Sequence, residues 1–249
     1  MKNKKTFIPG IFTALNIFCG FLAIIKISEG NIVTGCWLIV FAAIFDGLDG
    51  RLARLIKSSS NFGVEFDSLA DVISFGLAPA ILLYHIHFHK FGILGIIISF
   101  SPLVFGAVRL ARFNIQLSGF EKENFSGLPI PIAALSFVSF VIFNYYFWNE
   151  IYLIRVLGPQ LVLICILMVS TIEYYALPKF TFKAGKKNSL QIILMSIGFT
   201  LLILFPQETF YPLAVIYILW GVVRFFYRLL KNDNEADVKE SKQGIKKLK

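Results

Sequence analysis

The most regular feature of the sequence is a series of long apolar runs separated by short polar segments. Most runs approach the roughly 20 residues that a helix needs to cross a bilayer. The strict apolar–polar alternation of a soluble β-rich chain does not occur. The pattern predicts eight membrane-spanning helices, at about residues 8–27, 32–52, 64–84, 92–112, 128–147, 152–172, 189–206 and 209–228. Because the connection FPQETFYP is short, the last two could instead form a re-entrant pair.

Composition supports an all-α integral membrane protein, since 57% of the residues are hydrophobic and only 16% are charged. We expect residues 1–230 to form one polytopic membrane domain. Residues 231–249 are polar, charged and free of aromatic side chains. Such a segment cannot bury enough apolar surface to fold, so it is predicted to be a disordered cytoplasmic tail.

The basic residues indicate an orientation for these spans. If the N-terminus faces the cytoplasm, 21 of the 24 Lys and Arg residues fall in cytoplasmic segments, as the positive-inside rule requires. Both termini are then cytoplasmic, and the net charge of +9 faces anionic lipid headgroups. No nucleic-acid partner is expected, because the sequence has no soluble basic domain. The expected location is a cytoplasmic membrane, most simply that of a bacterium.

Four aspartates interrupt the apolar pattern at helical spacing. Asp46 and Asp49 are three residues apart near the end of the second span, and Asp67 and Asp71 are four apart at the start of the third. Each spacing places both carboxylates on one face of a helix. A cytoplasmic turn joins the two helices, so the four carboxylates are predicted to converge at one depth across a helical hairpin.

Four converging carboxylates repel one another unless cations compensate their charge. One interpretation is a structural network with Arg51 and Arg54 that caps the two helix ends. The other is a pair of divalent ions: hard oxygen ligands suit Mg²⁺ or Mn²⁺, and two such ions can clamp both oxygens of a phosphoryl transfer. The small residues Gly50 and Ala53 leave room for a ligand along this helix.

The arrangement DGLDGRLAR, eight further residues and then GVEFDSLAD resembles the motif of the CDP-alcohol phosphotransferase family, with every position filled. The first six spans likewise resemble the six-helix core of that family. The resemblance implies a membrane enzyme that moves a substituted phosphate from a CDP-linked donor to an alcohol and releases CMP. It implies that two metals are held by four residues: Asp46, Asp49, Asp67 and Asp71.

By the same resemblance, Asp71 is the general base, and Gly50, Ala53 and Arg54 line the CDP site. Thr13 and Asn16, polar positions in the first span, are candidates for that site as well, or form hydrogen bonds between helices. Members of the family are commonly dimers, so a homodimer is expected.

A second stretch bears on the acceptor. Arg109, Arg112 and Asn114 lie at the cytoplasmic end of the fourth span, and GLPIP opens the fifth. The arginines are candidates to bind a carboxylate or a lipid phosphate, or are ordinary cytoplasmic anchors. The segments ARFN, GLPIP and TALNIFCGFLA resemble the branch of the family whose acceptor is L-serine and whose donor is CDP-diacylglycerol.

These resemblances predict direct attack of the serine hydroxyl, deprotonated by Asp71, on the phosphorus that carries the diacylglycerol group. Within the family, inositol phosphate, glycerol phosphate and choline are alternative acceptors. An alternative from another class is a cation transporter whose aspartates bind the carried ion.

Overall fold

The computed structural model describes residues 3–56, 61–117, 127–172, 174 and 196–247. Within these ranges the regular structure is entirely helical, which confirms the predicted fold class. Six of the eight predicted spans are found as helical segments long and apolar enough to cross a membrane: Gly10–Ser28, Ile32–Leu52, Phe62–Ile86, Phe88–Ile115, Ile130–Trp148 and Pro206–Arg228. The chain is therefore a multi-pass membrane protein.

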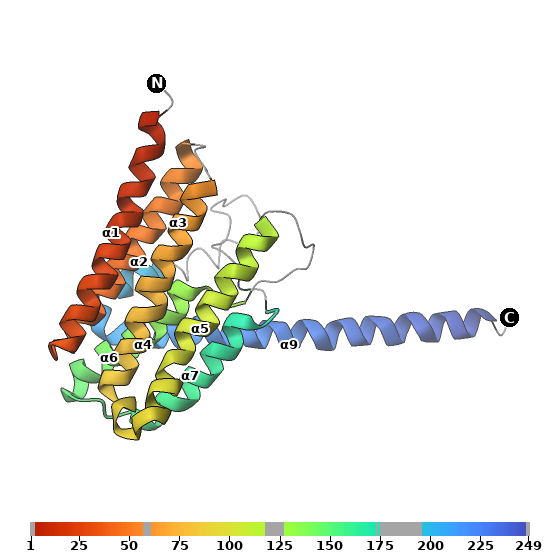
Figure 1. Cartoon of the computed structure of the whole chain (residues 1–249). Helices are drawn as coiled ribbons and strands as arrows, with labels where there is room; N and C mark the ends of the chain where they lie inside the picture. The colour runs from red at the N-terminus through yellow and green to blue at the C-terminus, as the bar shows by residue number, and fades with distance from the viewer. Residues whose placement is uncertain (1–2, 57–60, 118–126, 173, 175–195, 248–249) are drawn as a thin grey trace.

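The helices of the first five spans pack into a bundle, with several running steeply through the view in Figure 1. The third span is a composite of α-helical, π-helical and α-helical segments. A short 3₁₀ turn, η2 (Phe88–Phe91), precedes the fourth span. The elements in chain order are α1 (Asn3–Ser28), α2 (Ile32–Ile56), α3 (Asn61–Asp71), η1 (Val72–Leu77), α4 (Ala78–Ile86), α5 (Gly92–Leu117) and α6 (Ile130–Trp148).

The two other predicted spans differ from expectation. The sixth appears as α7 (Ile154–Val169), whose 16 residues extend about 24 Å, less than a typical hydrocarbon core. The seventh, 189–206, lies partly outside the described residues. Its described part is helical over 196–204 and turns at Phe205 into the last helix.

The last helix, α9 (Pro206–Lys247), lies across the direction of α1 to α5 rather than along it. Its C-terminal part extends away from the other helices (Figure 1). The helix continues through residues 231–247, where the sequence predicts a disordered tail. A polar helix without a packed face is marginal in water. Disorder of this tail in solution therefore stays a prediction.

The centre of the bundle is α6, which is apolar on all sides and therefore suited to burial. It packs against α2, α4, η1 and α9. Phe137, Val138, Phe140 and Val141, four of its side chains, are fully buried. This core fixes the positions of the neighbouring helices, including α2, which carries Asp46 and Asp49.

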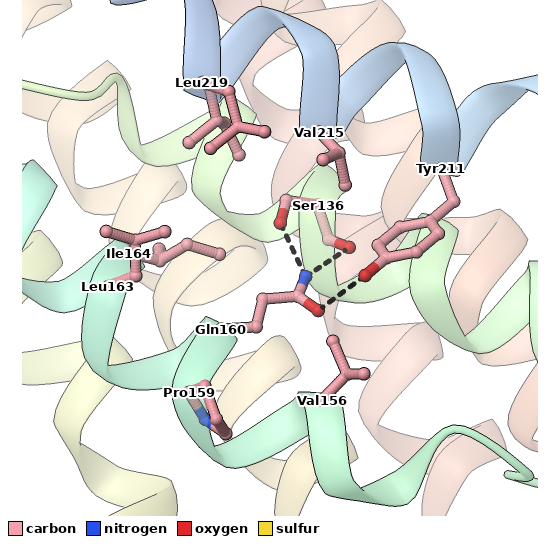
Figure 2. A pocket seen from close by; sticks show the side chains of 10 residues that line it. Ser136, Val156, Pro159, Gln160, Leu163, Ile164, Tyr211, Val215 and Leu219 are labelled. Carbon is pink, nitrogen blue, oxygen red and sulfur yellow. Dashed lines mark hydrogen bonds between the residues drawn. The ribbon is translucent and has the colours of Figure 1, made fainter. Parts of the chain in front are cut away.

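Buried amide side chains join α6 to α7 and α9. The Asn144 amide donates to the Phe140 carbonyl (2.8 Å), and its oxygen accepts from the Leu153 N–H (2.9 Å). Figure 2 shows Gln160 reaching from α7 to Ser136 of α6, with donor–acceptor distances of 2.8 Å to the hydroxyl and 3.1 Å to the carbonyl. The Tyr211 hydroxyl of α9 donates to Gln160 Oε1 (3.3 Å). This network borders a cavity of about 230 Å³.

Candidate active site

Three of the four aspartates bring their carboxylates together between α2 and α3. One carboxylate oxygen each from Asp46, Asp67 and Asp71 lies within 4.8 Å of the other two. Asp46 comes from α2, and the other two come from consecutive turns of α3. Among the described residues this is the one group of three potential metal ligands that lie this close. The helical spacing thus produces the predicted convergence for these three.

The fourth aspartate, Asp49, lies one turn further along α2 and is 5% exposed. Its Oδ2 accepts a hydrogen bond from the Thr13 hydroxyl of α1. Thr13 is itself buried at 3% exposure. The bond turns Asp49 toward α1, so the structure places it beside the group of three rather than within it.

Asn16, one turn beyond Thr13 on α1, is fully buried. Neither Nδ2 nor Oδ1 of its side chain has a hydrogen-bond partner among the described residues. A buried amide without partners costs free energy of about 1–3 kcal/mol unless a ligand or water completes its hydrogen bonds. Thr13 forms a hydrogen bond between helices, so the two interpretations offered for these residues both stay open.

The backbone of α1 is held close to η1, the π-helical segment that follows Asp71 directly. The Ser74 hydroxyl donates to the Asn16 carbonyl (2.9 Å). At Gly20, a Cβ atom would collide with the backbone and side chain of Ser74, so only glycine allows this approach. Ser74 was not singled out from the sequence, although it is a polar residue within an apolar run. π-Helical turns often occur at functional sites.

Asp71 and Arg109 each have a buried side-chain atom without a hydrogen-bond partner among the described residues. Asp71 is 7% exposed, and its Oδ1 has no hydrogen-bond partner in the described part of the chain. The same holds for Arg109 Nε. The Arg109 guanidinium lies over the Phe113 ring, 5.9 Å from its centroid. A buried carboxylate and a half-buried guanidinium, each with one buried atom that has no partner among the described residues, form a polar site able to take a charged ligand.

Of the two arginines considered for an aspartate–arginine network, Arg51 has no nitrogen within 4.0 Å of a carboxylate oxygen of another described residue. The side chain of Arg54 lies outside the described part of the structure, so the network is not tested for this residue. An ion pair does form at the other end of α1, between Lys26 and Glu29 (2.7 Å), where the Lys26 ammonium lowers the pKa of the Glu29 carboxyl. Three carboxylates this close fit a site for hard divalent cations.

Some predicted site residues are only partly described. Gly50 lies in α2 one residue beyond Asp49. Ala53 and Arg54 belong to the last turns of the same helix, but their side chains are outside the described part of the structure. Arg112 is exposed near the end of α5. Asn114 forms hydrogen bonds to Ser68 and Glu65 of α3.

The GLPIP segment has a structural role that its sequence did not reveal. The Leu128 N–H donates to the Leu167 carbonyl at the end of α7 (2.9 Å), and Leu128 is fully buried. Gly127 has φ +58°, and a Cβ there would collide with the Met168 carbonyl. The segment therefore anchors the start of α6 onto the end of α7.

The bundle holds converging carboxylates and a half-buried arginine at membrane depth, as an enzyme that acts on phosphate groups within a membrane requires. Residues 6–172 match the family of CDP-alcohol phosphatidyltransferases, and the chain belongs to this family. The family is generally metal-dependent, in agreement with the acidic cluster. Membership in this family of transferases also rules against the alternative interpretation from sequence, a cation transporter.

Curated relatives cover nearly the whole chain. It is 40% identical over 230 residues to a CDP-diacylglycerol–serine O-phosphatidyltransferase of Helicobacter pylori, covering 92% of this chain and 95% of the relative. A protein of the same name from Methanocaldococcus jannaschii is 36% identical over 224 residues, covering 90% and 96%. An archaetidylserine synthase of Methanothermobacter thermautotrophicus is 37% identical over 180 residues, covering 70% and 73%.

Proposed function

We propose that this protein transfers a phosphatidyl group from CDP-diacylglycerol to L-serine and forms phosphatidylserine and CMP. The observation that carries the proposal is the convergence of Asp46, Asp67 and Asp71 within a complete family motif. The choice of serine is supported by the relatives: their names differ in the lipid that is transferred but agree on serine.

The donor side of the site is assigned to α1, α2 and α3. Asp46, Asp49, Asp67 and Asp71 would hold two Mg²⁺ or Mn²⁺ ions, which would neutralise charge on the pyrophosphate when bound. Thr13 orients Asp49 through its hydroxyl. The CDP group would be lined by Gly50, Ala53, Arg54, Thr13 and Asn16, and the unpartnered amide of Asn16 supports its place there.

The acceptor side is assigned to α5. Arg109 and Arg112 would bind the serine carboxylate or the lipid phosphate, for which guanidinium groups provide paired donors. The buried Arg109 Nε, which has no partner in the described part of the chain, supports this role for Arg109. The family's alternative acceptors, inositol phosphate, glycerol phosphate and choline, are outcomes that the assay below distinguishes.

Asp71 would act as the general base. Its carboxylate takes the proton of the serine hydroxyl, whose oxygen then forms a bond to the phosphorus carrying the diacylglycerol group. The bond from that phosphorus to the bridging oxygen breaks, and CMP leaves with this oxygen. The chain's contribution is to hold hydroxyl and phosphorus in line and to keep the base unpaired until the acceptor arrives.

Orientation and assembly complete the proposal. The active site and both termini would face the cytoplasm from a bacterial cytoplasmic membrane, as the distribution of basic residues favours. Protease protection of a C-terminal tag in sealed inverted vesicles tests this orientation. The homodimer implied by the family resemblance is tested by the mass of the purified protein in detergent.

The deciding experiment measures CMP release from CDP-diacylglycerol by the purified protein with Mn²⁺ or Mg²⁺, with and without L-serine. Serine-dependent release that disappears in Asp71→Asn is the expected result. Release stimulated only by another alcohol would retain the family reaction and overturn the assignment of serine. No metal-dependent release with any acceptor would overturn the enzymatic proposal altogether.

A further inference from the structure

A hydrogen-bonded cluster of Glu65, Ser68 and Asn114 lies beside the proposed active site without belonging to it. Asn114 Nδ2 donates to Ser68 Oγ (3.0 Å) and to Glu65 Oε2 (3.4 Å). Ser68 Oγ lies 3.4 Å from Asn114 Oδ1, so the hydroxyl can donate back. One side chain of α5 thus contacts two residues of α3.

Ser68 lies between Glu65 and the aspartates around α3. At about 100° per residue, Ser68 is about 60° from both Glu65 and Asp71, whereas Asp67 and Asp71 are about 160° and 120° from Glu65. The cluster therefore borders the carboxylates on α3. Asn114 connects this border to α5 through its hydrogen bonds.

The hydrogen bonds of Asn114 to α3 affect the position of the arginines on the acceptor side. α3 packs mainly against α1 and η1 and touches α5 over only a short stretch. Near that stretch α5 carries Arg109 and Arg112, whose distance from Asp71 depends on how α5 sits against α3. Hydrogen bonds that fix this distance also fix where a bound carboxylate lies relative to the base.

We propose that Asn114, with Ser68 and Glu65, is a positioning cluster that sets the affinity for the acceptor without touching it. This inference rests on the proposed function, because the acceptor is taken to be serine bound by the arginines of α5. It gives Asn114 a positioning role in place of direct contact with the acceptor. Glu65, an exposed residue of α3, is part of this contact.

The test exchanges donor and acceptor across the contact. N114D removes the donating amide and places a second carboxylate beside Glu65, which should separate α3 from α5 by like-charge repulsion. E65Q alone keeps an acceptor oxygen for Asn114 and serves as the matched control. The double variant N114D/E65Q restores a hydrogen bond with donor and acceptor exchanged.

We expect N114D to raise the KM for serine roughly tenfold, about the effect of losing one hydrogen bond to a charged group, with kcat and the KM for CDP-diacylglycerol within about twofold. The double variant should return the serine KM to near the E65Q value. A serine KM that is unchanged in N114D, or raised but not rescued in the double variant, would overturn the proposal. So would an equal rise in the KM for CDP-diacylglycerol.

A second measurement does not depend on serine turnover. Spin labels at F62C on α3 and I115C on α5 report the separation of the two helices, with the native buried cysteines replaced. The distance distribution should widen in N114D and narrow again in N114D/E65Q. An unchanged distribution contradicts the positioning role, whereas absence of serine-dependent CMP release in the unmodified enzyme contradicts only the proposed reaction.

Discussion

Two regions of this molecule bury polar side chains at membrane depth, and they differ in how those side chains are satisfied. Beside the aspartates, Asn16, Asp71 and Arg109 keep buried atoms without hydrogen-bond partners in the described part of the chain. Between α6, α7 and α9, the side chains of Gln160 and Asn144 each have partners for both their oxygen and their nitrogen.

The difference separates a site from a scaffold. A closed network stabilises one arrangement of helices, whereas unpartnered buried groups lower the free energy of unfolding and persist where a ligand completes them. We therefore expect substitutions in the first region to change catalysis more than stability, and substitutions in the second to do the reverse. The predictions below test this contrast, beginning with the largest effect.

Asp71→Asn should reduce kcat by about 10²–10⁴-fold, the range associated with loss of a general base. The same change removes one of three close carboxylates, so the Tm of the metal-free protein should stay the same or rise. CMP release and thermal unfolding of the same preparation check both parts. Activity above a tenth of the unmodified value would exclude Asp71 as the base.

Removal of divalent metal by chelation should abolish CMP release and lower the Tm. At a metal concentration of 100 times Kd, binding stabilises the folded state by about 2.7 kcal/mol. Asp67→Asn should weaken this metal-dependent rise in Tm, whereas Gln160→Ala should leave it intact. An equal metal-dependent rise in Tm in the unmodified protein, Asp67→Asn and Gln160→Ala would show that the ions bind away from the aspartates.

Gln160→Ala leaves Tyr211 and Ser136 without their shared partner and should lower the free energy of unfolding by about 1 kcal/mol. Since Gln160 belongs to the closed network, kcat should not change. A double-mutant cycle with Tyr211→Phe measures the coupling of the pair. A fall in kcat at unchanged stability would place a function in the cavity beside Gln160.

Thr13→Val should have the smallest effect, a rise of about fivefold in the metal concentration needed for half-maximal activity. It removes one hydrogen bond to Asp49, worth about 1 kcal/mol, while keeping the shape of the side chain. A Mn²⁺ titration of CMP release measures the change, and Thr13→Ser, which keeps the hydroxyl, is the control. Identical curves for both variants would assign Thr13 to packing between helices.

Local periodicity made much of the fold and the acidic cluster predictable. Apolar runs identified the six long spans, and spacings of three and four residues brought Asp46, Asp67 and Asp71 together. These features depend on residues within one helix or one hairpin. A single sequence contains that information directly.

Features that depend on contacts between distant segments were not predictable. The hydrogen bond from Thr13 holds Asp49 toward α1, and Asn114 forms hydrogen bonds to α3. Likewise, α7 packs mainly against α5, and α9 crosses the bundle where it packs against α6. No periodicity along the chain specifies which helix lies opposite a given polar residue.

The π-helical segment Val72–Leu77 holds one residue more than an α-helical stretch with the same number of turns. Because the wider turn takes up this residue, the helical segments on either side keep the relative orientation that they would have in a continuous α-helix. Deleting a single residue here would convert the turn to an ordinary α-helical turn, with Asp67 and Asp71 still facing Asp46. Deleting a residue between Asp67 and Asp71 would instead rotate one of these carboxylates by about 100° relative to the other. The third span therefore accommodates the loss of a residue in the π-helical segment but not within the acidic motif.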